Sequence, residues 1–263
     1  MSRARPAPPV VLSIAGSDAG GGAGIQADLK TFMACGVHGT CAITAVTAQN
    51  TRGVRAVQVL PPRQIGAQIQ TVFDDFPVAA VKTGMLADAA TIRVVARALR
   101  AHAQVPLVLD PVMVATSGAR LLDARAVQVL IDELLPLASV LTPNLPEAEA
   151  LTGLRAGRAG TRAAIVAALL GLGAQAVLLK GGHARGSRIT DVYRDATQQR
   201  EFSHTRQPGA AHGTGCTLAA ALAAQLALGE PPVRAAQQAV AYVQRALARG
   251  WRLRRGGLLL LGH

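Results

Sequence analysis

The stretch His212-Gly213-Thr214-Gly215-Cys216-Thr217 joins a glycine turn directly to an apolar helix pattern. Glycines on both sides of Thr214 allow the backbone to curl, so that several N–H groups aim at one point. Leucines follow at helical spacing from 218 to 226, and the positive end of that helix faces the same point. The pattern predicts an anion site formed by Gly213, Thr214 and Gly215.

Cys216 falls in the first turn of the predicted helix. The field of the helix favours a thiolate there, and the side chain lies within reach of a group that meets the anion. Cys216 is therefore a candidate catalytic residue. A tight turn that caps a core helix and carries a buried cysteine explains the same residues equally well, so the rest of the chain must decide between them.

Other polar residues follow apolar runs that are expected to be strands. Asp110 and Glu147 offer the carboxylate oxygens that Mg2+ requires, although Glu147 is also an ordinary residue for a helix start. Asn144 opens that helix. Lys180 precedes two glycines and suits a phosphate, although a solvated lysine is the commoner case. With the anion turn, these groups are the ones that phosphoryl transfer without a P-loop requires.

Short apolar runs alternate with helical patterns and must position these groups. Strands that are apolar on both faces and alternate with helices predict a parallel sheet covered on both sides. In such sheets ligands bind beyond the carboxyl ends of the strands, where the polar residues gather. The expected strands are 10–14, 40–47, 53–60, 78–81, 107–109, 139–142 and 176–179, with 189–194 and 200–204 as an antiparallel edge.

A glycine-rich loop at 16–24 separates the first strand from a helix that ends at Gly36. Gly20, Gly22 and Gly24 do not have the spacing of a dinucleotide fingerprint, and no lysine follows to make a P-loop. Close approach of a small ligand is the better interpretation.

Composition bounds the protein class. The chain has 263 residues, half of them apolar, which suits one large α/β domain over 1–263 with flexible ends at 1–9 and about 252–263. The net charge of +12 comes mainly from scattered arginines, and only 3% of residues are aromatic, so we expect no nucleic-acid partner. Three cysteines without metal-ligand or disulfide spacing fit a reducing compartment. The apolar runs are too short for a signal or a membrane span, so we expect a cytoplasmic protein without membrane contact.

Seven blocks of residues in series resemble the bacterial hydroxymethylpyrimidine/phosphomethylpyrimidine kinases of thiamine biosynthesis, which are members of the ribokinase-like superfamily. The blocks are 16–18 with 21–30, then 48–51, 82–86, 109–113, 142–148, 180–183 and 212–217. The resemblance implies a ribokinase-like three-layer sandwich with a mostly parallel sheet. It also implies that ATP, with Mg2+, phosphorylates 4-amino-5-hydroxymethyl-2-methylpyrimidine and then its monophosphate.

The resemblance also assigns roles to individual residues. Gly213, Thr214, Gly215 and Cys216 form the anion hole, and Cys216 stands where most ribokinase-like relatives place an aspartate base. Gln49 bonds the aminopyrimidine, whose edge presents a donor beside an acceptor. The other expected pocket residues are Gly16, Ala23, Asp28, Met85 and Val112; the metal residues are Asp110 and Glu147, and the nucleotide residues are Lys180 and Asn144.

The sequence departs from the family pattern at three places. Gly20 stands where relatives commonly have serine, and Thr116 stands where they commonly have lysine, which puts details of phosphate contact in question. The segment 252–263 lacks the usual glycine-rich ending with a Gly-Pro step.

Two other functions fit parts of the pattern. A pyridoxal kinase is the nearest, since some close relatives with the same cysteine turn phosphorylate vitamin B6 alcohols or aldehydes. A non-catalytic pyrimidine or nucleotide sensor is less favoured, because a sensor has no need of Asp110, Glu147 and the anion turn together. We also expect a homodimer.

Overall fold

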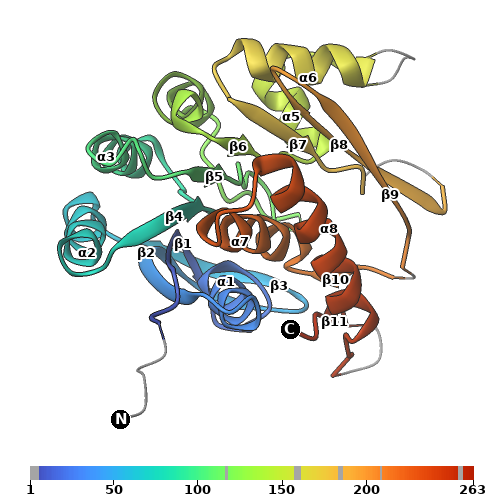
Figure 1. Cartoon of the computed structure of the whole chain (residues 1–263). Coiled ribbons are helices and arrows are strands. Elements are labelled where there is room, and N and C mark those ends of the chain that lie inside the picture. The colour runs from blue at the N-terminus through green and yellow to red at the C-terminus, as the bar shows by residue number, and fades with distance from the viewer. Residues whose placement is uncertain (1–5, 116–117, 157–160, 183–185, 208, 254–256) are drawn as a thin grey trace.

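One large sheet organises the computed structural model, which describes residues 6–115, 118–156, 161–182, 186–207, 209–253 and 257–263. In this part of the chain nine strands follow the order β3-β2-β1-β4-β5-β6-β7-β8-β9 (Figure 1). Strands β2 to β7 of that order run parallel, while β3, β8 and β9 are antiparallel edges. The strands are β1 Val10–Asp18, β2 His38–Asn50, β3 Gly53–Val59, β4 Val78–Thr83, β5 Leu107–Leu109, β6 Val140–Leu141, β7 Ala176–Leu179, β8 Arg188–Asp195 and β9 Gln199–Thr205.

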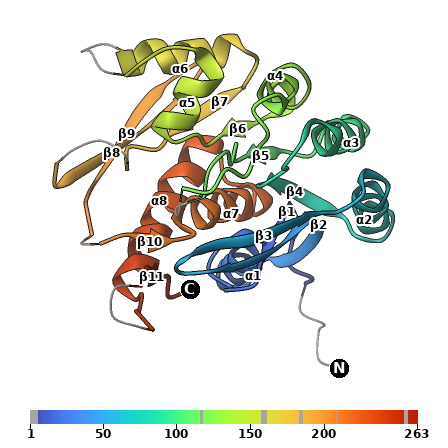
Figure 2. The same cartoon turned by 180° about the vertical axis from the view of Figure 1, so that it is seen from behind.

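Helices cover both faces of the sheet, as the two opposite views show (Figure 1, Figure 2). On one face lie α1 (Gly24–Ala34), α7 (Thr214–Ala227) and α8 (Pro232–Ala248). The other face carries α2 (Pro62–Asp75), α3 (Ala89–Arg100), α4 (Ala126–Val129), the π turn Leu130–Leu134, the 3-10 turn Leu135–Leu137, α5 (Leu145–Thr152) and α6 (Thr161–Gly171). The expected three-layer α/β sandwich is confirmed. None of the helices in the described ranges is long and apolar enough to cross a membrane.

Alternation along the central strands builds two cores. Leu107 and Leu109 of β5 pack against the face with α3, while Val108 between them packs against the face with α7. Because successive strand residues point to opposite faces, a strand covered on both sides must be apolar throughout. This requirement explains the unbroken apolar runs and sends polar residues to the strand ends.

Most predicted elements are confirmed, with shifts at their ends. The first strand does not stop at Ala15 but continues to Asp18, and β2 continues to Asn50, so Gln49 lies within a strand rather than after it. Pairing with neighbouring strands extends both.

The C-terminal region, which was expected to be flexible from about 252, contains a short strand. β11 (Leu259–Leu260) pairs in parallel with β10 (Ala211–His212), directly before the predicted anion turn. Thr116, His183 and residues 1–5 lie outside the described residues, so the expectations that concern them are not addressed by the structure.

The N-cap of α3 offers a test of fold stability. Asp88 accepts a hydrogen bond from the Thr91 N–H at 2.8 Å. Replacing an N-cap aspartate with alanine costs about 0.5–2 kcal/mol. We therefore expect Asp88→Ala to lower the free energy of unfolding by that amount in denaturant titrations. Arg97→Ala, on the exposed side of the same helix, is the control, and an equal loss in both variants would contradict the capping role.

Candidate active site

A cavity of about 1050 Å³ opens at the carboxyl ends of the central strands. Small-molecule sites usually enclose about 300–1,000 Å³, so this space is large enough for two small ligands side by side. Of the residues expected at the site, all except Asp28 line this cavity. The lining residues that were expected are Gly16, Ala23, Gln49, Met85, Asp110, Val112, Asn144, Glu147, Lys180, Gly213, Thr214, Gly215 and Cys216.

The predicted anion turn is formed at the start of α7. Gly213 has a φ of 79°, in the left-handed region, and immediately precedes the helix. A Cβ at this position would overlap the carbonyl oxygen of Gly22, so only glycine fits. The first N–H groups of a helix have no intrahelical partners, and those of Thr214 and Gly215 are therefore free to bind an anion. A Cβ on Gly215 would lie 3.3 Å from Nζ of Lys180, which places the turn against that lysine.

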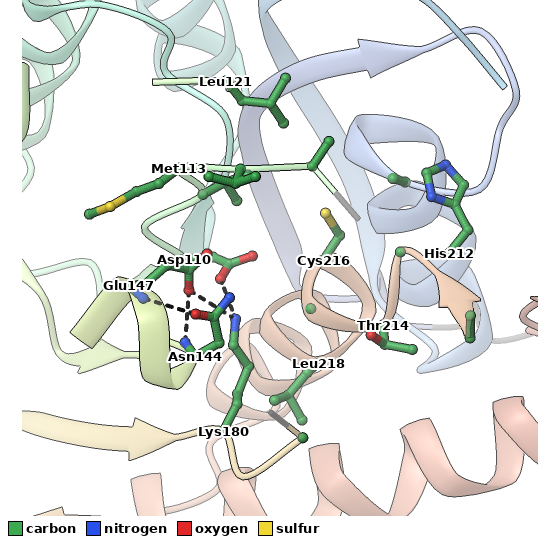
Figure 3. A pocket seen from close by; sticks show the side chains of 18 of the residues that line it. Asp110, Met113, Leu121, Asn144, Glu147, Lys180, His212, Thr214, Cys216 and Leu218 are labelled. Carbon is green, nitrogen blue, oxygen red and sulfur yellow. Dashed lines mark hydrogen bonds and ion pairs between the residues drawn. The ribbon is translucent and has the colours of Figure 1, made fainter. Parts of the chain in front are cut away.

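Cys216 lies between the two halves of the site. Figure 3 shows its sulfur pointing into the cavity, with Asp110, Glu147 and Lys180 on one side and His212 on the other. Burial raises the pKa of the thiol to about 11, and the opposing effect of Lys82 does not offset it. The expectation of a thiolate at the helix start is therefore wrong, because desolvation outweighs the helix field.

Asp28 does not line the cavity, contrary to expectation. Its carboxylate is fully buried beneath it, 2.8 Å from Nζ of Lys82, and accepts a hydrogen bond from the Ser13 hydroxyl at 2.6 Å. Lys82 itself reaches the cavity wall. Burial lowers the pKa of Lys82, but the carboxylates of Asp28 and Asp110 raise it above its usual range, so the lysine stays charged. Asp28 therefore acts on the site through Lys82.

The predicted metal and nucleotide residues form one cluster across from this pair. Lys180 Nζ lies 2.9 Å from Asp110 Oδ1 and 3.7 Å from Glu147 Oε2. Asn144 caps α5: its side chain accepts from the Glu147 N–H at 2.9 Å, and the Asn144 N–H donates to the Glu147 carboxylate at 2.7 Å. This capping box holds Glu147 with its carboxylate toward Asp110 (Figure 3).

The donor set of this cluster fits Mg2+. Two carboxylates share one lysine on one cavity wall, and no group of three or more His, Cys, Asp or Glu side chains suited to a metal occurs among the described residues. Mg2+ usually binds through one or two carboxylates together with substrate phosphates and water, rather than in an all-protein cage. Asp110 and Glu147 match this preference.

A second polar network lies on the other side of Cys216. Its residues Asp18 and His212 belong to the motif blocks of the sequence analysis, which did not predict their pairing. Asp18 accepts hydrogen bonds from the N–H groups of Gly20, Gly22 and Ala23, and His212 Nε2 lies 2.8 Å from its carboxylate. The same nitrogen lies 3.3 Å from the side-chain nitrogen of Gln49. The network ties the glycine loop, the anion turn and Gln49 together.

The wall toward β8 and β9 was also missed. His204 Nε2 lies 3.1 Å from Asp191, whose other oxygen accepts from the Gly181 N–H at 2.7 Å. Val240 and Val243 of α8 add apolar surface to the same cavity. Asp191 thus joins the segment after Lys180 to β8 and β9.

The signals for these missed groups were weak. Asp18 followed by glycine at position 20 is a common aspartate-turn pattern, so its bond to the Gly20 N–H was predictable. Nothing in the sequence pairs Asp18 with His212, or Asp191 with His204, because each pairing depends on how separate segments meet.

Comparison with known proteins gives a consistent result. A family model described as phosphomethylpyrimidine kinase matches residues 18–259. The hydroxymethylpyrimidine/phosphomethylpyrimidine kinase of Rhizobium meliloti (strain 1021) is 51% identical over 249 residues, covering 94% of this chain and 93% of the relative.

Two solved structures extend the comparison to the fold. The phosphomethylpyrimidine kinase of Clostridium difficile 630 is 41% identical, with a TM-score of 0.81, and the match covers 90% of this chain and 99% of that one. The pyridoxal kinase of Staphylococcus aureus, solved in complex with AMP-PCP and pyridoxal, is 34% identical, with a TM-score of 0.88 and coverage of 98% and 94%.

The buried pair beneath Cys216 generates a stability prediction. Lys82→Met leaves the Asp28 carboxylate buried without its partner, and breaking such pairs costs about 3–5 kcal/mol. We expect that loss in denaturant unfolding. The double variant Asp28→Asn with Lys82→Met removes both charges and should recover much of the stability. A single variant that loses less than about 1 kcal/mol would contradict this account.

Glu147 generates a prediction about pH. Burial raises its pKa from 4.5 to about 7, although Lys180 opposes the change. Between pH 4.5 and about 7, Glu147 holds a proton in the folded protein that the unfolded chain has released. The contribution of this proton to the free energy of unfolding is therefore present at low pH and is lost as the pH rises toward 7.

The measurement is thermal unfolding in EDTA from pH 5 to 8. Glu147→Gln keeps the capping bond but does not titrate, so its melting temperature should rise relative to that of the wild type as pH increases. A constant difference across this range would show that Glu147 does not titrate there.

Proposed function

The chain belongs to the phosphomethylpyrimidine kinase family, and from this premise we propose that it phosphorylates 4-amino-5-hydroxymethyl-2-methylpyrimidine with ATP, and then phosphorylates the product again to the pyrophosphate, in thiamine biosynthesis. One observation carries the proposal. A single cavity is lined by an anion turn with Cys216, by a carboxylate pair with a lysine, and by an amide in a partly apolar pocket. Phosphoryl transfer to a small polar ring requires these three parts together.

The acceptor side is built around Gln49. Met85, Val112 and Ala23 supply apolar surface, and Gly16 leaves room because a Cβ there would lie 3.1 Å from the Met85 sulfur. An amide in such a pocket pairs with the donor and acceptor edge of an aminopyrimidine. The hydroxymethyl group then points toward Cys216 and the anion turn.

The donor side lies beyond the turn. The positive end of α7 and Lys180 face the phosphates of ATP, and the wall formed by Val240, Val243 and His204 takes the nucleoside. Asn144 holds Glu147 in place beside Asp110. Mg2+ held by Asp110 and Glu147 would neutralise charge on the transferring phosphoryl group.

Transfer forms a bond from the hydroxymethyl oxygen to the γ-phosphorus and breaks the bond to ADP. In the second round an oxygen of the pyrimidine monophosphate is the attacking atom. Because the transition state is loose, the attacking hydroxyl loses its proton late, to an oxygen of the phosphoryl group that is transferred, and needs positioning more than a strong base. A neutral thiol at Cys216 suits that role, with the charge of Lys82 beneath it. Cys216 thus orients the attacking oxygen, in place of the aspartate base of ribokinase-like relatives.

Pyridoxal phosphorylation is the second candidate. The pyridoxal kinase of S. aureus shares the fold along almost the whole chain. Gln49 favours the pyrimidine, because a pyridine with a phenolic oxygen presents a different hydrogen-bonding edge to the amide. We further infer that the chain acts as a single domain over 1–263 and as a homodimer. A reaction that uses ATP and a free thiol suits the cytoplasm.

The substrate assignment is tested with both alcohols. For the wild type, kcat/KM should be higher with the hydroxymethylpyrimidine than with pyridoxal. Only the pyrimidine should give a diphosphate product in addition to the monophosphate. Gln49→Ala leaves polar substrate atoms unpaired, a loss of about 1–3 kcal/mol, so KM for the pyrimidine should rise about 5- to 150-fold while KM for ATP changes little. A preference for pyridoxal, or a pyrimidine KM indifferent to Gln49, would overturn the assignment.

The role of Cys216 is tested by separating activity from stability. Cys216→Ala should lower kcat by about 100-fold because the attacking oxygen loses its positioning contact. The melting temperature should change little, since leucines and alanines hold α7 in the core. Cys35→Ala, outside the cavity, is the matched control. Full activity in Cys216→Ala would leave the residue as a packing group only.

A further inference from the structure

The amide of Gln49, as it is oriented in the structure, faces two neighbours whose donors and acceptors do not match its own. The Gln49 side-chain nitrogen lies 3.3 Å from His212 Nε2, and its side-chain oxygen lies 3.3 Å from the Thr47 hydroxyl. An amide has an oxygen and a nitrogen of nearly equal size, so a half turn about the last side-chain bond exchanges them without other movement. The neighbours therefore decide which orientation is stable.

His212 presents an N–H edge without a free lone pair on the side of Gln49. Asp18 accepts hydrogen bonds from backbone N–H groups, and these, with His212, lower its pKa despite burial, so its carboxylate is ionised and can only accept. His212 Nε2 lies 2.8 Å from this carboxylate and must carry a hydrogen, which it donates to Asp18. This nitrogen therefore has no lone pair for the Gln49 amide nitrogen, and the amide oxygen is the better neighbour for it. The other ring nitrogen, Nδ1, is buried without a partner, which suits a lone pair better than an N–H.

Thr47 presents an acceptor on its side of Gln49. Its hydroxyl hydrogen is directed to the carbonyl oxygen of Ser17 at 2.9 Å, a shorter contact than the 3.3 Å to Gln49. The hydroxyl oxygen keeps lone pairs for a donor. The two neighbours therefore agree: the amide oxygen of Gln49 belongs beside His212 and the amide nitrogen beside Thr47.

We propose that Asp18 and His212 act as a positioning pair that fixes the amide of Gln49 in this orientation, and so determines which hydrogen-bonding edge of the pyrimidine the site accepts. The inference rests on the proposed function. In the fixed orientation the oxygen can accept from the ligand, and the nitrogen has one N–H left to donate to it. They match a ring that presents an amino donor beside a ring-nitrogen acceptor.

The fixed amide also disfavours a ring that presents the reversed order of donor and acceptor. A pyrimidine with an oxo group in place of the 4-amino group presents an acceptor beside a ring N–H donor. The two molecules have nearly the same shape, so only the order of donor and acceptor separates them. If the amide rotated freely, it could form hydrogen bonds with either the 4-amino or the 4-oxo ring. When His212 and Thr47 hold it in one orientation, it matches the 4-amino ring alone.

The experiment measures kcat/KM with ATP for the 4-amino and 4-oxo forms of 5-hydroxymethyl-2-methylpyrimidine. The wild type should favour the amino form by about 10- to 100-fold, as expected when buried polar groups are left unpaired. His212→Phe keeps a ring beside Gly22 but has no N–H, so the amide is released and the ratio should fall to within about 3-fold. His212→Leu is a second variant, and circular dichroism checks that both fold.

His204→Phe is the matched control, because His204 is also paired with a carboxylate on the cavity wall, at 3.1 Å from Asp191, but does not contact Gln49. It should change the rates for both pyrimidines by the same factor and leave the ratio intact. A ratio preserved in the folded His212 variants would reduce His212 to a structural role and overturn the proposal.

The wild type separates this inference from the proposed function. Equal rates with the two pyrimidines would overturn the fixed orientation of the Gln49 amide but would still agree with the proposed pyrimidine kinase activity. If the wild type phosphorylates neither pyrimidine, the proposed function is wrong, and the proposed role of Asp18 and His212 is wrong with it.

Discussion

The close contact between Gly213 and Gly22 is the constraint on which the site depends. A Cβ on Gly213 would overlap the carbonyl oxygen of Gly22, and a Cβ on Gly22 would overlap the ring of His212. The contact brings the positive end of α7 to the carboxyl edge of the sheet, beside the glycine loop that follows β1. Asp18 holds that loop through three N–H groups, and β11 supports the strand that leads into the turn. Distant parts of the chain thus converge on one anion site.

Charge in the interior is arranged in pairs around this site. Lys82 with Asp28 lies beneath Cys216, and Lys180 joins Asp110 and Glu147 on the facing wall. Each lysine keeps its charge because a carboxylate lies within hydrogen-bonding distance, whereas a lone buried ion would lose its charge. The thiol of Cys216 lies between the pairs and stays neutral because burial dominates its environment. A site built this way offers fixed positive charge to phosphates without an ionised nucleophile.

The residues that recognise a ligand are held by others that do not touch it. Gln49 is oriented by His212 and Thr47, Glu147 by the capping bond to Asn144, and Lys82 by Asp28. Supporting contacts of this kind set the geometry of a site to within the tolerance that catalysis and selectivity require. This arrangement explains why Asp28 belongs to the site although it lies below the cavity wall.

The sequence by itself determined the layers of the fold, the strand-end residues and the chemistry of the anion turn. Those features follow from local rules: apolar runs form strands buried on both faces, glycines permit left-handed turns, and parallel strands bring Asp110, Asn144 and Lys180 to one edge. Only the tertiary structure decided the protonation of Cys216, the depth of Asp28, the extension of β2 through Gln49 and the pairing of Asp18 with His212. Each of these depends on burial and on contacts between segments far apart in the chain, and no local pattern encodes how deeply a group is buried or which distant charge it meets.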